Sequence, residues 1–276
     1  DEALKFDLLK TKEWGYNMVR KHIKVEPARW YYYCDMLGLI VWQDMPNVAD
    51  NHSLMMPHRP EEIGKMQRNK WAQDTFSIPG TDCQVPPLWK ENYYDEWREI
   101  ITDLRCFPCI LVWVPFNEAW GQFDTEEVAA FTKALDPTRL VDAASGGNLR
   151  FCGDIIDVHH YPAPALNAFD RKYVNVLGEY GGIGYPVEDH LWQKDANWGY
   201  GDVMTDGEQV LDLYEEFALM LKTFIANGCA AAVYTQTTDV EVEVNGLMTY
   251  DRKVIKIDED RFAEINRSVI EAGPKK

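Results

Sequence analysis

Several features that would assign a chain to a special class are scarce or absent in this sequence. No apolar run approaches the roughly 20 residues that a membrane-spanning helix needs, so we expect no membrane partner. Basic residues are outnumbered, with 28 Lys and Arg against 45 Asp and Glu and a formal net charge of −17. A surface of this sign repels a phosphate backbone, which excludes nucleic acid as an expected partner. A neutral sugar meets no such repulsion.

Cysteine is also sparse, with six residues at irregular spacing in 276. A domain of this size does not need disulfide bonds to fold. Cys106 and Cys109 form the sequence's one C-x-x-C, which is found in redox pairs and in half-sites for zinc. Because Pro108 lies inside it and no second C-x-x-C follows, we favour a turn that leads into a buried strand.

The chain begins without Met and without the basic and apolar segments of a signal peptide. Residues 1–12 instead predict an amphipathic helix. We therefore expect the sequence to be an excised piece, and its localisation stays open between the cytoplasm and a periplasmic or secreted site.

What the chain does contain is a regular alternation of apolar strands and amphipathic helices, which predicts an α/β fold with a parallel sheet. Its length suits one barrel of about 250 residues. The segment 45–87 is too long for a simple connection, and we expect it to cover a functional site. Strands are predicted over 16–21, 39–42, 110–116, 140–143, 155–159, 174–177 and 230–234, and helices over 1–13, 27–37, 88–104, 125–135, 208–227 and 252–270.

Two glutamates come directly after apolar strands. Glu118 follows the segment 109–116, and Glu179 follows the segment 174–177. Because parallel strands of a barrel end at the same face, we expect the two carboxylates to lie close together. Cleavage of a glycosidic bond needs such a pair, one acid and one nucleophile or base. The alternative is two surface glutamates at the start of loops.

Motifs across nearly the whole chain resemble the catalytic barrel of glycoside hydrolase family 2, which contains β-galactosidases, β-glucuronidases and β-mannosidases. Residues 17–22 (NMVRKH) resemble the family's second strand, and residues 33–39 (YCDMLGL) its CD-x-x-G helix end. Residues 113–118 (WVPFNE) resemble the acid/base strand, and residues 178–181 (GEYG) the nucleophile strand.

The resemblance implies a (β/α)8 TIM barrel with the acid/base on strand four and the nucleophile on strand seven. Counting the strand at 16–21 as the second places Glu118 and Glu179 on those strands. We therefore expect residues 1–276 to be a single catalytic barrel domain that lacks its first strand, with upstream β-sandwich domains absent. The exposed sheet edges of such a barrel would favour association between copies as a homo-oligomer.

The resemblance further implies a retaining exo-β-glycosidase, in which Glu179 is the nucleophile and Glu118 the acid/base. Arg20 would orient Glu179, Asn117 would hold the sugar 2-hydroxyl, and Tyr161 would hydrogen-bond Glu179. The other residues predicted to bind substrate are His22, Asp44, Trp120, His159 and Tyr234. Six of these residues have a structural alternative: an ion pair for Arg20, a satisfied histidine near the barrel mouth for His22, a turn for Asn117, a helix cap for Asp44, and a core position for Trp120 and Tyr234.

Two departures from the family pattern bear on the sugar. Tyr234 stands where the family's last strand usually carries Trp. Residues 243–246 (EVNG) stand where glucuronidases have Asn-x-Lys-Gly, whose Lys pairs with the sugar carboxylate. Replacing that Lys while gaining Glu243 should disfavour a uronate through like-charge repulsion. We expect a neutral, galactoside-type carbohydrate substrate; glucuronidase or mannosidase specificity and a non-catalytic sugar-binding relative remain the alternatives.

No cofactor and no metal site are predicted. His159 and His160 are adjacent in a strand, so their side chains face opposite ways and cannot chelate one ion together. The chain has no H-E-x-x-H run, which argues against a zinc hydrolase. Some family members bind magnesium near the acid/base, but no ligand set in this sequence identifies such a site.

Overall fold

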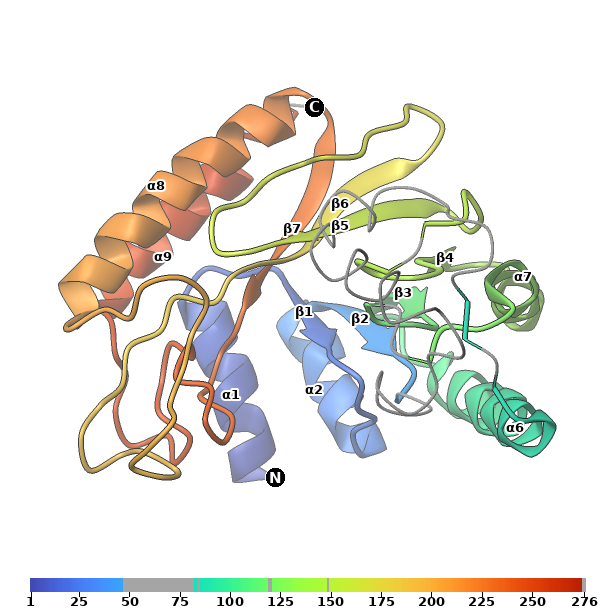
Figure 1. Ribbon diagram of the computed structural model, residues 1–276, viewed down its shortest axis with the longest axis horizontal. Helices are drawn as coiled ribbons and strands as arrows, with labels where there is room; N and C mark the ends of the chain where they lie inside the picture. The colour runs from blue at the N-terminus through green and yellow to red at the C-terminus, as the bar shows by residue number, and fades with distance from the viewer. Residues whose placement is uncertain (47–81, 84, 119–120, 148, 275–276) are drawn as a thin grey trace, which may run out of the picture. The chain divides into compact units, whose positions relative to one another are not determined.

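The computed structural model describes residues 1–46, 82–83, 85–118, 121–147 and 149–274 (Figure 1). Contacts divide the chain into two compact units. The first unit contains Met18–His159 and Asn167–Val176 together with Asp1, and the second contains Glu2–Asn17, His160–Leu166 and Leu177–Lys276. The predicted loop 45–87 lies almost wholly outside the described residues, and so does Trp120.

The first unit is built on a parallel sheet with strand order β1-β2-β3-β4. Trp42 pairs with Arg20 on one side and with Val112 on the other. The apolar run of the central strands is buried almost throughout, as expected for strands covered on both faces. The parallel sheet predicted from the alternation is thus confirmed. The strands are β1 (Met18–Lys21), β2 (Ile40–Asp44), β3 (Ile110–Val114) and β4 (Leu140–Val141).

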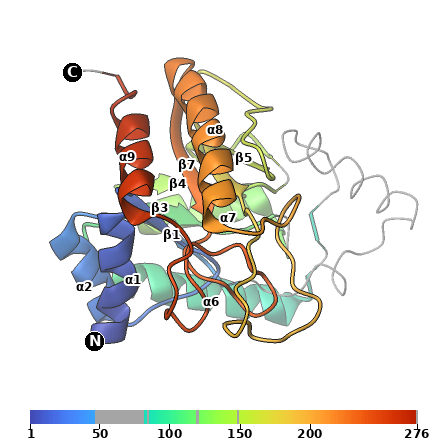
Figure 2. The same ribbon diagram turned by 90° about the vertical axis from the view of Figure 1, so that its left-hand side faces the viewer.

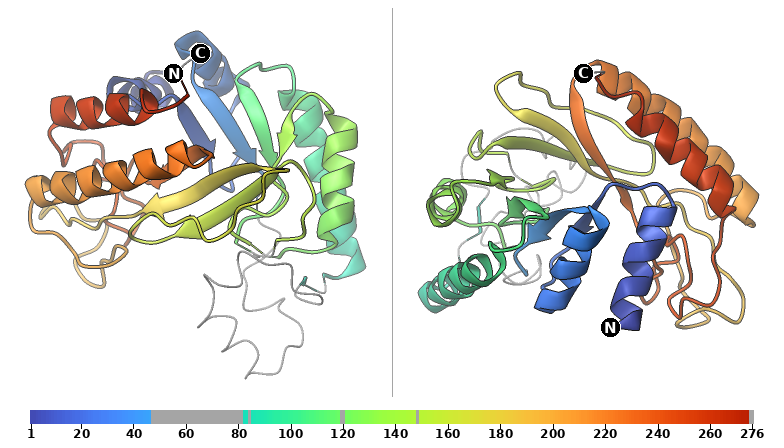
Figure 3. Two further views of the ribbon diagram at one scale, coloured as in Figure 1. Left: turned by 90° about the horizontal axis from the view of Figure 1, so that it is seen from above. Right: turned by 180° about the vertical axis from the view of Figure 1, so that it is seen from behind.

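Three helices of the first unit pack beside this sheet, α2 (Ala28–Leu37), α6 (Pro87–Leu104) and α7 (Thr125–Leu135). Figure 3 shows α6 and α7 side by side. A buried hydrogen bond of 2.8 Å from Trp97 Nε1 to Thr132 Oγ1 joins these two helices. Helix α2 ends at Gly38, which has a φ of +64°, as the glycine C-cap predicts.

The second unit contains α1 (Glu2–Glu13), α8 (Gly207–Ala226), α9 (Glu259–Ile270) and β7 (Cys229–Thr235). Helices α8 and α9 run side by side (Figure 2). Trp14, Tyr16 and Tyr214 each pack a ring against Phe262 of α9. These aromatic contacts bring the N-terminal segment and the C-terminal helix into one core.

Helix α9 corrects the prediction of a helix over 252–270, because it begins only at Glu259. The Asp258 side chain accepts a hydrogen bond from the Arg261 amide, which is an N-cap. The preceding Lys256 amide donates to Leu247 O, and the Lys256 ammonium is buried against Asp239. These contacts hold the chain before Asp258 out of a helix.

The remaining strands, β5 (Ile155–His160) and β6 (Val174–Gly181), form a second sheet with β7 in the order β5-β6-β7. Strand β6 is longer than the predicted 174–177. The Gly181 amide donates to Pro162 O at 2.9 Å, which carries the extended backbone past residue 177. Glu179 therefore lies inside its strand, not after it. None of the helices in the described part of the chain is long and apolar enough to cross a membrane.

Candidate active site

In the first unit, the backbone fixes Glu118 at the end of β3. The Glu118 amide donates to Ser145 O at 2.8 Å, and the Ser145 amide donates to Phe116 O at 2.9 Å. Glu118 has a φ of +49°, a left-handed conformation that is uncommon for a residue with a side chain. Strained backbone of this kind is concentrated at functional sites. The backbone contacts therefore fix the position of Glu118 independently of its side-chain contacts.

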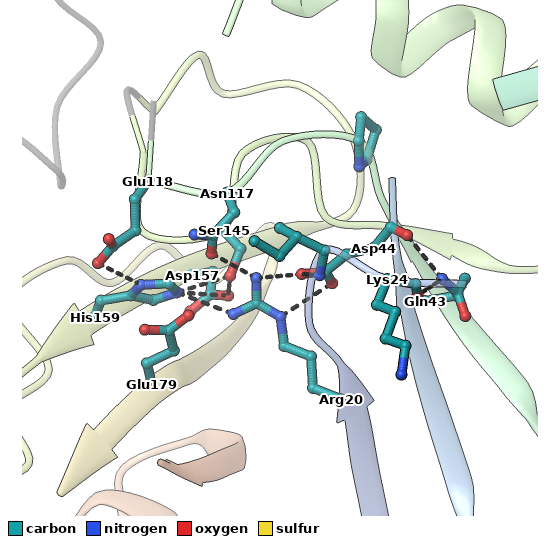
Figure 4. A network of polar contacts seen from close by, with 12 residues as sticks. Arg20, Lys24, Gln43, Asp44, Asn117, Glu118, Ser145, Asp157, His159 and Glu179 are labelled. Atoms are coloured by element: carbon teal, nitrogen blue, oxygen red, sulfur yellow. Dashed lines mark hydrogen bonds and ion pairs between the residues drawn. The ribbon is translucent and has the colours of Figure 1, made fainter. Parts of the chain in front are cut away.

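The side chain of Glu118 contacts the buried imidazole of His159 (Figure 4). His159 Nδ1 lies 3.2 Å from Glu118 Oε1, and Nε2 lies 2.8 Å from Ser145 Oγ and 3.3 Å from Arg20 Nη1. Gly146 has a φ of +59°, and a Cβ built on it would lie 2.2 Å from His159 Cγ. The ring therefore packs directly on the Gly146 backbone, and His159 reaches Glu118 only because residue 146 has no side chain.

Arg20 joins the strand ends of the first unit. It makes a two-pronged ion pair with Asp44, at 3.0 Å from Nε and 2.8 Å from Nη2, and Nη2 also donates to Asn117 Oδ1 at 2.7 Å (Figure 4). Both members of the ion pair are buried. The structural alternative for Arg20 is therefore confirmed, while its orientation of Glu179 stays a prediction.

Asp44 is committed to this ion pair. One of its oxygens also accepts the Ile23 amide at 3.1 Å. Asp44 is completely buried beneath these partners. Its contact with a sugar hydroxyl stays a prediction. His22, which follows β1, has an exposed side chain, and its contact with substrate stays a prediction.

A pair of buried acids, which the sequence analysis missed, extends the network. Ser145 Oγ donates to Asp157, and Asp157 lies beside Asp142, whose side chain is 1 % exposed. Burial, and next the neighbouring charge of Asp157, raise the pKa of Asp142 well above its usual range. The sequence does carry a signal for this pair, because Asp142 directly follows the short apolar strand β4 and Asp157 lies inside the next strand, at residues 155–160.

In the second unit, Glu179 is held by a phenol. The Tyr161 hydroxyl donates to Glu179 Oε2 at 2.6 Å and lies 2.7 Å from Thr235 Oγ1, so the predicted Tyr161–Glu179 hydrogen bond is present. Burial, followed by the charge of Glu179, raises the pKa of Tyr161 well above its usual range. The phenol therefore stays a neutral donor at every working pH.

Aromatic residues of the segment 185–207 extend this arrangement, and the sequence analysis did not single them out. The Tyr200 ring stacks on the Tyr161 ring at 3.7 Å between centroids, and Trp198 meets Tyr200 edge-on at 5.2 Å. Tyr234 instead packs against Tyr180 and Tyr214 and is buried. These contacts agree with the core alternative for Tyr234, and its role as a sugar platform stays a prediction.

Cys106 and Cys109 are free thiols, the first exposed and the second buried, at a turn that leads into β3. The turn interpretation of the C-x-x-C is confirmed.

Comparison with known proteins decides the family. Residues 1–180 match the model of the glycosyl hydrolases family 2, TIM barrel domain. The chain belongs to this family. Membership places it among the glycoside hydrolases and confirms both the resemblance and the TIM-barrel fold class drawn from the sequence.

Relatives in the family carry several activity names. A β-galactosidase of Klebsiella pneumoniae is 26% identical over 180 residues, which cover 63% of this chain and 15% of that protein. A putative β-glucuronidase of Formosa agariphila is 30% identical over 143 residues, covering 52% of this chain and 11% of that protein. This chain thus spans a small part of the length of the relatives it matches.

A solved structure supports the fold. The β-D-glucuronidase of Dictyoglomus thermophilum superposes with a TM-score of 0.67 at 17% identity, over 97% of this chain and 47% of that one. At this identity the likeness concerns the barrel fold alone.

Proposed function

We propose that this domain catalyses retaining hydrolysis of terminal β-glycosides, with Glu179 as nucleophile and Glu118 as acid/base. The observation that carries the proposal is the hydrogen bond from Tyr161 to Glu179, on the strand whose GEYG run resembles the family's nucleophile strand. A phenol donor stabilises the ionised form of a carboxylate, and a nucleophile has to be ionised to attack.

The proposed chemistry has two steps. Glu179 attacks the anomeric carbon and forms a glycosyl ester, while Glu118 gives its proton to the departing glycosidic oxygen. Glu118 then takes a proton from water, whose oxygen attacks the same carbon and releases Glu179. The mechanism requires both glutamates to reach one sugar, with their carboxyl groups about 5–5.5 Å apart. Residues 1–276 would then act as one catalytic domain.

A neutral, galactoside-type sugar is the proposed substrate. The position that would hold a cation for a uronate carries Glu243, whose Oε2 accepts a hydrogen bond of 3.1 Å from Gln236 Nε2. The same amide donates to Asn245 Oδ1 at 2.6 Å. A carboxylate held in this place would repel a uronate and would accept hydrogen bonds from sugar hydroxyls. The β-galactosidase names of several relatives support the same choice.

The test measures p-nitrophenol release from the β-galactoside, β-glucuronide, β-mannoside and β-glucoside by the full-length protein. We expect cleavage of the β-galactoside and a loss of at least about 10³-fold in Glu118→Ala and Glu179→Ala. Added azide assigns the roles. It should restore turnover of an activated substrate in both variants, giving a β-glycosyl azide with Glu118→Ala and an α-glycosyl azide with Glu179→Ala.

A folded protein that cleaves no member of the panel would contradict the proposal and favour a sugar-binding relative without catalysis. Cleavage of the β-glucuronide alone would contradict only the neutral-sugar part. Azide products of the opposite configurations would reverse the assigned roles.

A further inference from the structure

Trp198 in the second unit is an exposed ring on a fixed backbone. Its side chain is 39% exposed, yet its amide donates to Val242 O and its carbonyl accepts from the Val244 amide, both at 2.9 Å. These bonds form a parallel bridge between Trp198 and Glu243 in the segment that follows β7. An exposed indole on an ordered backbone loses little conformational entropy when it binds a ligand.

A second set of contacts fixes the same segment to the chain that follows Glu179. The Tyr200 amide donates to Gly182 O at 2.8 Å. A Cβ on Gly199 would lie 2.4 Å from Gly184 Cα, and a Cβ on Gly182 would lie 2.3 Å from the Tyr200 ring. Gly182 and Gly184, which follow β6, therefore lie directly against residues 199 and 200. A side chain at either glycine would block this close approach.

The rings connect Trp198 to the proposed nucleophile through contacts within the second unit. Tyr161 donates to Glu179, Tyr200 covers the Tyr161 ring at an interplanar angle of 11°, and Trp198 meets Tyr200 at 73°. Trp198 is thus two ring contacts away from the phenol that holds Glu179. A ring at this remove from the nucleophile is placed to meet the next residue of a bound glycan, beyond the sugar that Glu179 attacks.

The chemistry around Trp198 is that of a sugar subsite. An indole offers an apolar face for the C–H groups of a pyranose, together with an N–H donor at its edge. The backbone of Trp198 is bridged to that of Glu243, which is half-buried and held by Gln236, so the indole stands on an ordered segment. An isolated surface Trp would need neither the two backbone bonds nor the glycine contacts behind it.

We propose that Trp198, backed by Tyr200, binds the sugar on the leaving-group side of the scissile bond. This inference rests on the proposed function. An exo-acting glycosidase holds one sugar on the glycone side, so an outlying platform serves the leaving group. The natural substrate is then a β-linked disaccharide or longer glycan, and not a glycoside of a small alcohol.

The experiment compares two galactosides that differ only in the leaving group. Lactose carries a second sugar, whereas β-galactosyl fluoride carries a single atom that cannot reach the platform. For Trp198→Ala in the full-length protein we expect kcat/KM to fall about tenfold on lactose, the scale of one aromatic contact, and to stay unchanged on the fluoride. Trp198→Phe should recover part of the loss.

Trp192→Ala is the matched control, because Trp192 is 61% exposed and its ring meets Tyr250 instead of Tyr200. It should leave both substrates unaffected. Unchanged kcat/KM of Trp198→Ala on lactose would overturn the proposal. An equal fall on both substrates would also overturn it, because the indole would then act on the galactosyl unit or on folding.

A binding readout separates this proposal from the proposed function. Lactose is titrated into Glu179→Gln while tryptophan fluorescence is followed, and the titration is repeated in Glu179→Gln with Trp198→Ala. A saturable change that disappears in the double variant supports the platform even if wild-type protein hydrolyses neither galactoside. A titration identical in the two proteins, or no change in either, overturns it.

Discussion

The two proposed catalytic glutamates lie in surroundings of opposite character. Glu118 contacts an imidazole that belongs to a buried ionic network with Arg20, Ser145 and Asp157. Glu179 contacts a phenol whose other neighbours are a threonine hydroxyl and a stacked ring. Of the contacts described within each unit, that of Glu118 is with an imidazole in an ionic network, and that of Glu179 is with a neutral phenol.

This difference matches what the proposed chemistry asks of each residue. An acid/base changes its protonation state twice in every turnover, and an imidazole partner can change its own hydrogen bonding in response. A nucleophile needs to remain ionised. A hydrogen-bond donor that stays neutral stabilises the anion over the whole pH range. Variants that exchange or remove these partners test whether the contrast has functional meaning.

The largest effect should come from the cation of the Glu118 network. Arg20→Met leaves Asp44 completely buried without its counter-ion, and breaking such a pair costs about 3–5 kcal/mol of unfolding free energy. Urea denaturation at pH 7 measures the loss. Arg20→Lys keeps the charge without the two-pronged geometry and should lose less. Equal stability of wild type and Arg20→Met would show that the ionic network contributes nothing to the fold.

A smaller effect is expected from the neutral partner of Glu179. Tyr161→Phe keeps the ring stack on Tyr200 and removes one hydrogen bond to a carboxylate, worth about 1.5–3 kcal/mol. We expect kcat/KM on the cleaved p-nitrophenyl glycoside to fall about 10- to 100-fold. Thr235→Val removes only the second partner of the phenol and should have a weaker effect. A Tyr161→Phe enzyme with wild-type kcat/KM would remove the distinction between the two glutamates.

The smallest effect concerns the buried acids behind His159. Because the folded-state pKa of Asp142 is raised, the folded protein binds more protons than the unfolded chain above about pH 4. The free energy of unfolding should therefore fall as pH rises from about 4 through the raised pKa. Asp142→Asn removes the titrating group beside Asp157, Arg20 and Asp44. The free energy of unfolding of this variant should therefore fall less than that of wild type over the same pH range. The difference should be of order 1 kcal/mol for each unit by which folding raises the pKa of Asp142.

Urea midpoints at pH 5, 6, 7 and 8 measure this slope, with exposed Asp103→Asn as the control. Parallel stability curves for wild type and Asp142→Asn would show that Asp142 ionises equally in the folded and unfolded states.

The alternation of elements could be predicted from the sequence because each central strand is a short apolar run and each helix has a recognisable end. Gly38 is an example, since its position after an amphipathic segment predicts the cap that is observed. The contact of Tyr161 with Glu179 was also predictable, because Tyr161 follows a predicted strand on the same face as His159. The start of α9 was not, because it depends on Lys256 pairing with Asp239 seventeen positions earlier.

The ionic network around Glu118 and the aromatic contacts next to the Tyr161–Glu179 hydrogen bond could not be predicted from local sequence patterns. Arg20 and Asp44 meet through neighbouring strands, and the spacing of the two residues does not identify the pair. The segment that holds Trp198 and Tyr200 has no periodicity, so its rings look like those of any polar loop. The backbone bonds of Trp198 and the close approach of Gly199 to Gly184 show that this segment is fixed, and neither can be read from the sequence.

That approach has a consequence for how the leaving-group preference could change during evolution or design. Where two backbones touch, an insertion or any larger residue at 182, 184 or 199 would separate them and displace the whole aromatic segment. The side chain at position 198 lies outside the contact and can be exchanged while the backbone stays in place. New substrate preferences are therefore expected to arise by single substitutions at Trp198, on a frame whose length and glycines do not vary.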